Sequence, residues 1–279
     1  MKYKVVADSS CNLHALPDIP FEAVPLKILG SSREYVDDCH LDVGEMVATL
    51  KAEKTAASTS CPNMLEWQDA FESAENVFAV ALTSQLSGSY NAAIQAAGDY
   101  KRSHPDRRIW VLDTLSTGPE MQLIIEKLRE CILSEGTFDQ IRKSVREYSS
   151  HTHLLFALQS LDNLAKNGRC SMALAKVAGV LGIRVVGKAS DQGTLEPLAK
   201  VRGEKKALET LLNELAKGNF CGGKIRIAHC FNLKAAEALQ KMILDCYPGS
   251  DIEILSCGGL CSYYADLGGL LVAYEDGDR

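Results

Sequence analysis

The chain has 279 residues, a net charge of −6 and a sequence pI near 5.6. This length allows one large or two ordinary domains, each with its own apolar core. The acidic balance and the lack of a dense Lys/Arg tract argue against nucleic-acid binding, which needs a surface that neutralises phosphates. No apolar run approaches the length of a membrane span, and the ten cysteines contain no Cys-x-x-Cys pair. We therefore expect a soluble cytoplasmic protein with reduced thiols.

The first half of the chain alternates strand-like runs with amphipathic helices. The strand-like apolar runs are 3–7, 77–82 and 109–112. Helical periodicity follows at 64–73, 91–100 and 121–135. This alternation predicts an N-terminal α/β domain over residues 1–150, with a doubly wound parallel sheet. The polar stretch 30–42 interrupts the pattern and predicts a hairpin or excursion that carries Asp37 and Asp38.

A second α/β domain is predicted over residues 151–279. Its strand-like runs are 153–158, 184–189, 195–201, 224–230, 252–256 and 269–274. Its helical runs are 160–166, 172–181, 203–216 and 234–246. Asp191-Gln192-Gly193 forms a turn between two strands and so predicts an antiparallel hairpin. The sheet of this domain should therefore be mixed.

Each strand of the first half ends in hydroxyl residues that precede a helix. These three clusters are Asp8 to Ser10, Thr83 to Ser89 and Asp113 to Gly118. In an open parallel sheet, ligands collect outside the carboxyl ends of the strands, and the free N–H groups of the next helix favour a negative group. The sequence thus predicts a small acid or a phosphate as the ligand, without indicating a reaction.

The strongest candidate for a binding loop is Thr83 to Ser89, which contains four hydroxyl residues. A helix cap uses one side-chain oxygen, such as that of Ser87 or Ser89, so the others favour ligand binding beside Gly88. The cluster Ser58 to Pro62 has two interpretations: it caps the helix near Met64, or it adds further donors. If the two loops meet, Thr59 and Ser87 both donate to one carboxylate.

Several charged or imidazole side chains are weaker candidates. Arg169 lies on a turn and is predicted to supply charge across an interdomain cleft, with an ordinary surface Arg as the alternative. Arg202 ends a strand and is predicted to be a surface contact. His151 and His153 share a strand face without a nearby acidic or Cys ligand in the sequence, so we expect a structural strand edge and no metal or cofactor.

Motifs of the common catalytic and nucleotide-binding sites are missing. We find no Gly-x-Gly-x-x-Gly, no P-loop, no Gly-x-Ser-x-Gly and no His-Glu-x-x-His. A serine without a base is a hydrogen-bond donor rather than a nucleophile. We therefore expect binding rather than catalysis, and no catalytic residue is predicted.

Strings distributed in order along almost the whole chain closely resemble the DegV family. They are "ADSSCNL" at 7–13, "STSCPN" at 58–63, "LTSQLSGSYNAA" at 82–93, "LFALQSLDNLAKNGR" at 155–169, "LGIRVVGKASDQGTLEPLAKVRGEKKAL" at 181–208 and the final glycine-rich strand. The resemblance implies a protein that binds a long-chain fatty acid between two α/β domains. In bacteria with a fatty acid kinase, such proteins serve as its FakB subunit, which presents the acyl carboxylate for phosphorylation.

The resemblance also implies roles for individual residues. Thr59 and Ser87 would hold the carboxylate, while Arg169 and Arg202 would lie near the head group or the kinase-docking face. The predicted ligand-binding set is Thr59, Ser60, Ser87, Gly88, Ser89, Arg169 and Tyr263. The predicted partner contacts are Arg202 and Tyr264.

The chain departs from the family pattern at three places. The family's C-terminal loop usually has a His followed by Gly-Pro-Gly, whereas this chain has Tyr263 to Leu267. Glu120 and Gln122 stand where the family tends to place glycines, and we expect these larger side chains to shorten or reshape the acyl tunnel. Cys61 stands where a Gln is common.

Two other functions remain open at the level of the sequence. The first is an enzyme that acts on a small anionic substrate, with a hydroxyl of the 83–89 loop as nucleophile. The second is a protein that has lost ligand binding and acts only through contacts with other proteins. An apolar tunnel with a polar end would favour the carrier. A short polar pocket with a His or Asp beside Ser87 would favour the enzyme.

Overall fold

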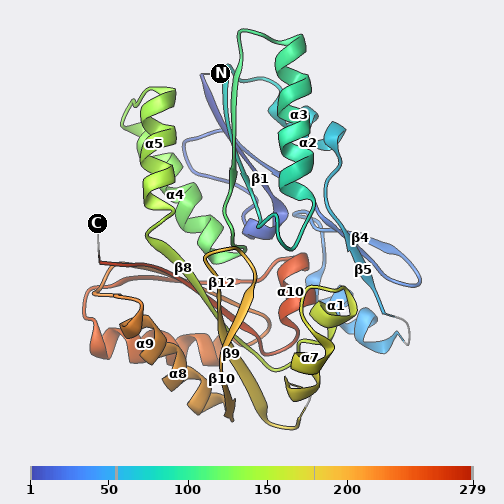
Figure 1. The fold of residues 1–279 in the computed structure, drawn as a ribbon, viewed down its shortest axis with the longest axis vertical. Coiled ribbons are helices and arrows are strands. Elements are labelled where there is room, and N and C mark those ends of the chain that lie inside the picture. Colours follow the sequence, from blue (N-terminus) through green and yellow to red (C-terminus); the bar gives the residue numbers. More distant parts are fainter. Residues whose placement is uncertain (1, 54–55, 179, 278–279) are drawn as a thin grey trace.

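The computed structural model describes residues 2–53, 56–178 and 180–277. In this part of the chain, a parallel sheet, a mixed sheet and a small antiparallel sheet are packed together with helices (Figure 1). The α/β class and the combination of parallel and mixed sheets confirm the fold predicted from the sequence.

The N-terminal sheet has four parallel strands in the order β2-β1-β6-β7. Their bounds are β1 Tyr3–Asp8, β2 Phe21–Val24, β6 Asn76–Ala81 and β7 Arg108–Asp113. Helices α2 (Met64–Phe71) and α3 (Ser89–Ser103) pack on one face, and α4 (Pro119–Leu133) and α5 (Phe138–Tyr148) on the other (Figure 1). Because both faces are covered, the strands are continuous apolar runs.

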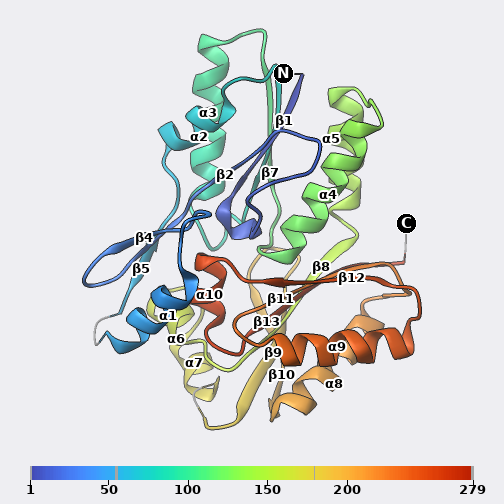
Figure 2. The same cartoon turned by 180° about the vertical axis from the view of Figure 1, so that it is seen from behind.

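A small antiparallel sheet in the order β4-β3-β5 extends from the N-terminal part of the chain (Figure 2). It contains β3 (Lys27–Leu29), β4 (Glu34–Val36) and β5 (Ser58–Ser60), and α1 (Val43–Ala52) lies between β4 and β5 in the chain. β3 and β4 form an antiparallel hairpin whose turn and second strand lie within the predicted excursion 30–42, while its first strand precedes it. The strand β5 was not expected, because the Ser/Thr cluster was interpreted as a loop.

The C-terminal sheet has six strands in the order β10-β9-β8-β13-β11-β12. The strands are β8 Thr152–Leu158, β9 Ile183–Ala189, β10 Leu195–Arg202, β11 Lys224–His229, β12 Asp251–Ser256 and β13 Leu270–Glu275. The hairpin β9–β10 is antiparallel and β11–β12 is parallel, so the prediction of a mixed sheet is confirmed.

Helices cover both faces of this mixed sheet. The helices α8 (Glu204–Lys217) and α9 (Leu233–Cys246) cover one face. Three shorter helices lie on the side of the other face: α6 Asp162–Lys166, α7 Met172–Ala178 and α10 Gly259–Ala265. Residue 179, within the helix predicted at 172–181, lies outside the described residues.

Helix α4 lies between the parallel and the mixed sheet. It packs against β1 and β6 on one side and against β8, β11 and β13 on the other. Its Glu126 carboxylate accepts two hydrogen bonds from the Arg226 guanidinium on β11, each 2.7 Å long. Helix α4 therefore connects the two sheets through packing and through this ion pair. None of the described helices has the length and apolar composition that crossing a bilayer requires.

Candidate functional site

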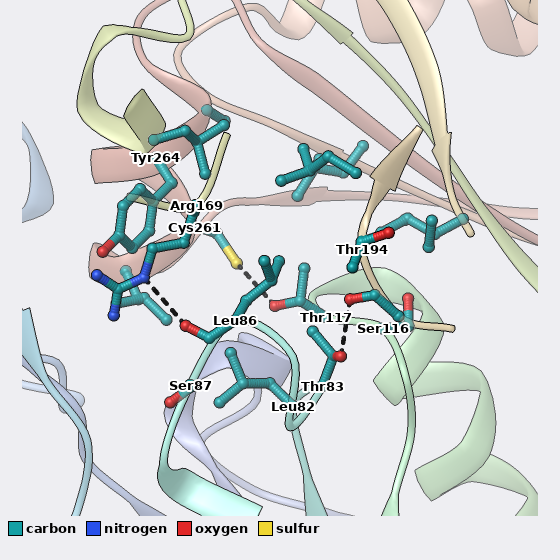
Figure 3. A pocket seen from close by; sticks show the side chains of 18 of the residues that line it. Leu82, Thr83, Leu86, Ser87, Ser116, Thr117, Arg169, Thr194, Cys261 and Tyr264 are labelled. Carbon is teal, nitrogen blue, oxygen red and sulfur yellow. Dashed lines mark hydrogen bonds between the residues drawn. The ribbon is translucent and has the colours of Figure 1, made fainter. Parts of the chain in front are cut away.

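A cavity of about 300 Å³ lies between the parallel sheet and the mixed sheet (Figure 3). Its walls come from the loops after β6 and β7, from β8, from the β9–β10 hairpin and from α10. The loops after β6 and β7 follow the carboxyl ends of parallel strands, where the sequence predicted a ligand. The cavity is therefore built by segments from both halves of the chain.

The long wall of the cavity is apolar. On β8, Leu154, Phe156 and Leu158 point to the cavity, whereas Leu155 and Ala157 point to the core beneath α8 and α9. This alternation follows from the two-residue period of a strand. The opposite wall is formed mainly by leucines from the loops, Leu82, Leu86 and Leu115.

Polar side chains line the cavity in two places (Figure 3). Thr83, Ser116, Thr117 and Thr194 lie on one side, and a second group lies around Arg169, at what we call the polar end. Thr59 and Ser60 of β5, Ser87 and Gly88 at the start of α3, Arg169 and Tyr264 all line it. The Tyr264 hydroxyl lies 2.7 Å from Thr59 Oγ1. A Cβ atom on Gly88 would lie 3.2 Å from Cys61 Sγ, so the 59–61 and 86–88 segments converge as the sequence analysis anticipated.

Arg169 supplies the positive charge at this end. Its Nε donates to the Leu86 carbonyl at 3.0 Å (Figure 3). One Nη also donates to the Asn167 carbonyl. Within the described part of the chain, no carboxylate forms an ion pair with it. Backbone carbonyls thus orient the guanidinium without neutralising it, which favours an anionic partner.

Tyr264 is a neutral hydrogen-bonding group at the same end. Burial raises the pKa of Tyr264 above its usual value, although the hydrogen bond with Thr59 and the nearby charge of Arg169 act in the opposite direction. The phenol therefore keeps its proton around neutral pH and can donate to a carboxylate.

The four hydroxyl residues of the 83–89 loop have different partners. Thr83 Oγ1 donates to the Gly193 carbonyl at 2.8 Å and so connects this loop to the β9–β10 hairpin. Ser87 Oγ accepts the Ser89 N–H at 3.2 Å, which leaves its own proton available. Ser84 does not line the cavity. Of the four, Ser87 is the one at the polar end.

Ser89 does not occupy the ligand-binding position that was predicted for it. Its side chain is fully buried, and its Oγ donates to Asp8 at 2.8 Å. Asp8 also accepts from Ser10 Oγ and from the Leu82 N–H. Burial raises the pKa of Asp8 to about 6, although these hydrogen bonds oppose the shift. The hydroxyl cluster after β1 thus stabilises a buried carboxyl group.

The two adjacent tyrosines of α10 have exchanged the positions predicted for them. Tyr264, expected at a partner surface, lines the cavity. Tyr263, expected at the ligand, is buried outside it and donates to the Ala57 carbonyl at 2.6 Å. Neighbouring helical residues point about 100° apart, so only one of the two can face the cavity.

Arg202 and the bulky residues of α4 lie away from the cavity walls. Arg202 is exposed at the end of β10. Glu120 and Gln122 are buried on α4 and do not line the cavity themselves. Glu120 instead accepts a hydrogen bond from Thr152 Oγ1 at 2.9 Å, where α4 meets the mixed sheet.

His153 lies on β8, and His151 lies just before this strand. Both contact one acidic residue, Asp276, which the sequence did not indicate as their partner. His151 Nδ1 and His153 Nε2 lie 3.0 Å and 2.9 Å from the two carboxylate oxygens of Asp276. Among the described residues, no group of three or more His, Cys, Asp or Glu side chains is arranged to hold a metal ion. These histidines connect the start of β8 to the end of β13.

The β9–β10 hairpin and Cys261 also line the cavity, although no sequence pattern indicated them. Ala189, Gly193 and Leu195 close one side of the cavity, and Cys261 lies on the same turn of α10 as Tyr264. The hairpin was predicted, but nothing in its sequence indicates that its tip reaches across to Thr83.

A family model described as an uncharacterised protein of the DegV family matches residues 2–275. A DegV domain-containing protein from Streptococcus pneumoniae strain R6 is 42% identical over 279 residues, which cover 99% of each chain. A DegV domain-containing protein from Streptococcus gordonii is 39% identical over 281 residues, covering 99% of this chain and 100% of the relative.

Solved structures resemble the protein over nearly its whole length. The Streptococcus pneumoniae Fatty Acid Kinase (Fak) B3 protein, loaded with linoleic acid, has a TM-score of 0.97, 42% identity and 99% coverage of both chains. A DegV family protein from Eubacterium eligens, loaded with heptadecanoic acid, has a TM-score of 0.96 and 40% identity, with 98% of this chain and 99% of that chain covered. From the extent of these matches, we conclude that this chain belongs to the DegV family.

Proposed function

We propose that this protein is a carrier that binds a long-chain fatty acid in the cavity between its two halves, residues 1–150 and 151–279. The observation that carries the proposal is an apolar cavity whose polar end contains Thr59, Ser87, Tyr264 and an Arg169 guanidinium without a carboxylate partner among the described residues. The solved relatives that are described as loaded with linoleic and heptadecanoic acid support this ligand class.

The energetics of the two ends differ. Burying about fifteen methylene groups contributes on the order of 12 kcal/mol before the costs of association, at about 0.8 kcal/mol each. A hydrogen bond to a charged carboxylate contributes about 1.5–3 kcal/mol net. The apolar wall therefore sets the affinity, and the polar end determines which end of the ligand lies beside Arg169.

The protein carries out no reaction on the fatty acid in this proposal and needs no cofactor. It presents the carboxylate to a separate fatty acid kinase, a role supported by the kinase B3 protein among its relatives. The exposed Arg202 at the end of β10 is the proposed contact with that partner. All ten cysteines are free, which supports a reducing cytoplasm as the location.

Native mass spectrometry of the purified recombinant protein tests the ligand assignment. We expect a discrete added mass of one acyl chain, which is displaced by added palmitate. The double variant Thr59→Ala/Ser87→Ala should bind palmitate at least tenfold more weakly and remain folded, whereas Ser84→Ala, in the same loop but outside the cavity, should bind normally. A chain that neither carries nor binds fatty acids would contradict the proposal.

The partner assignment needs a separate assay. With the fatty acid kinase subunit, ATP and loaded protein, we expect ADP release that depends on the bound acid. Arg202→Ala should bind palmitate as the wild type does but should reduce ADP release. Equal release from both proteins would remove Arg202 from the docking surface.

A further inference from the structure

Helix α10 is a short helix with a buried beginning. It has seven residues, Gly259–Ala265, and it carries Tyr264 and Cys261 into the cavity. Its N-cap residue is Gly258, which has no side chain to accept the first free N–H groups of the helix. Gly259 and Leu260 are buried, so their N–H groups need an acceptor from elsewhere in the fold.

Asp37 supplies this acceptor from a distant part of the chain. Its carboxylate accepts from the Gly259 N–H at 2.6 Å and from the Leu260 N–H at 3.0 Å. Ser9 Oγ donates to the same carboxylate at 2.9 Å and fixes its orientation. A negative group at this end also interacts favourably with the helix dipole.

The glycine at position 259 makes this contact possible. A Cβ atom there would lie 2.7 Å from Asp37 Oδ1 and 2.5 Å from Leu41 Cδ2. Any other residue would displace the carboxylate from the helix. The close approach of Asp37 thus explains Gly259, whereas a Cβ atom on Gly258 would lie nearest to Asn12 Oδ1, at 3.0 Å.

The same small sheet contacts α10 at both of its ends. Asp37 follows β4 directly and contacts the first turn of α10, whereas Thr59 lies on β5 and contacts Tyr264 near the last turn. Both strands pair with β3, which fixes the separation of the two contacts. The position of the Tyr264 hydroxyl therefore depends on how the first turn is held.

We propose that Asp37 is the positioning residue of the carboxylate site, holding α10 so that Tyr264 and Thr59 together select a carboxylate over an uncharged head group. This inference rests on the proposed function, because it concerns the same polar end. Asp37 does not line the cavity, so its effect on the ligand passes through α10.

The test compares the affinities of palmitate and hexadecanol, which share the tail and differ in the head group. We expect Asp37→Asn to reduce the ratio of the two affinities about tenfold, since an amide leaves at least one of its three donors without an acceptor. Hexadecanol affinity should change less than twofold. Asp38→Asn is the matched control, because Asp38 accepts only the nearby His40 N–H in the described structure and should leave the ratio unchanged.

A double-mutant cycle separates positioning from a general loss of structure. If Asp37 acts through Tyr264, adding Asp37→Asn to Tyr264→Phe should change the ratio little further. An Asp37→Asn variant that is folded and keeps the wild-type affinity ratio overturns the inference. The inference is also overturned if the double variant changes the ratio by the product of the two single-variant changes, because the two residues then act independently. A wild type without preference for palmitate would instead overturn the proposed function.

A second variant covers the case in which Asp37→Asn does not fold. Gly259→Ala keeps the charge of Asp37 and raises the helix propensity of α10, but its methyl group displaces the carboxylate. In the folded variant we expect a lowered palmitate-to-hexadecanol ratio together with a lowered melting temperature, because the buried Gly259 and Leu260 N–H groups lose their acceptor. An unchanged ratio in this variant counts against Asp37 as the positioning residue.

Discussion

The Tyr264 hydroxyl and Thr59 Oγ1 lie 2.7 Å apart, although 205 positions separate the two residues in the chain. This hydrogen bond joins α10 to β5 at the polar end of the cavity. It places the two hydroxyl groups beside each other at this end, and burial keeps the Tyr264 phenol protonated around neutral pH. The polar end thus offers an anionic ligand one guanidinium charge and neutral hydrogen-bonding groups.

Tyr264→Phe and Tyr263→Phe should have different consequences. Removing the Tyr264 hydroxyl should weaken palmitate binding about tenfold, because a donor to the carboxylate is lost, with little effect on stability. Removing the Tyr263 hydroxyl should instead lower the free energy of unfolding by about 1–2 kcal/mol, since the Ala57 carbonyl and Asn167 lose a buried partner. Isothermal titration calorimetry and urea denaturation separate the two effects, and a binding defect in Tyr263→Phe would contradict the assignment.

Two serines in one loop should also behave differently when replaced by alanine. Ser89→Ala should lower the free energy of unfolding by about 1–3 kcal/mol, because the buried Asp8 carboxyl loses a donor. Its palmitate affinity should stay within about twofold of the wild type. Ser87→Ala should weaken palmitate binding instead, because Ser87 lines the polar end of the cavity. If Ser89→Ala lost binding and kept its stability, Ser89 rather than Ser87 would be the ligand contact.

The ion pair between Arg226 and Glu126 should contribute to stability. The Arg226 side chain is 6% exposed, and its replacement by Met leaves Glu126 without its main partner in a half-buried place. We expect Arg226→Met to lower the free energy of unfolding by about 2–4 kcal/mol. The control Arg108→Met breaks the exposed Arg108–Asp139 pair and should cost less than about 1 kcal/mol. Equal losses in urea denaturation would show that α4 does not depend on this contact.

Asp8 should make stability depend on pH. Its pKa is raised from 3.8 to about 6 by burial, so the folded protein takes up a proton between pH 6 and 4 that the unfolded chain does not. Protonation in this range favours the folded state, and the benefit is lost as the pH rises through 6. Relative to Asp8→Asn, the wild type should gain about 2 kcal/mol of unfolding free energy when the pH falls from 7.5 to 4.

Urea denaturation of the wild type and Asp8→Asn at several pH values measures this difference directly. Asp37 and Glu120 are also buried with a raised pKa, but they are present in both proteins and cancel in the comparison. A difference that stays constant between pH 7.5 and 4 would show that Asp8 does not titrate in the folded state within this range.

The cluster Ser58 to Pro62 illustrates why a local pattern has more than one structural solution. The sequence allowed it to cap the helix that begins near Met64. In the structure, Asn63 is the cap: its Oδ1 accepts the N–H groups of Leu65 and Glu66, and Glu66 accepts the Asn63 N–H in return. This leaves Thr59 free of the helix and available to β5 and the cavity. Asn63 lies directly before the helix and is the residue placed to accept its first free N–H groups.

The amino-acid sequence by itself determined the alternation of strands and helices, the mixed character of the second sheet and the family. These features depend on apolar periodicity, turn residues and ordered motifs, all of which are local along the chain. Only the tertiary structure decided that Tyr264 rather than Tyr263 faces the cavity, that Ser89 binds Asp8, and that Asp37 holds α10. The reason is physical: a short helix takes its rotation and its cap from whatever packs against it, and those contacts join residues more than two hundred positions apart.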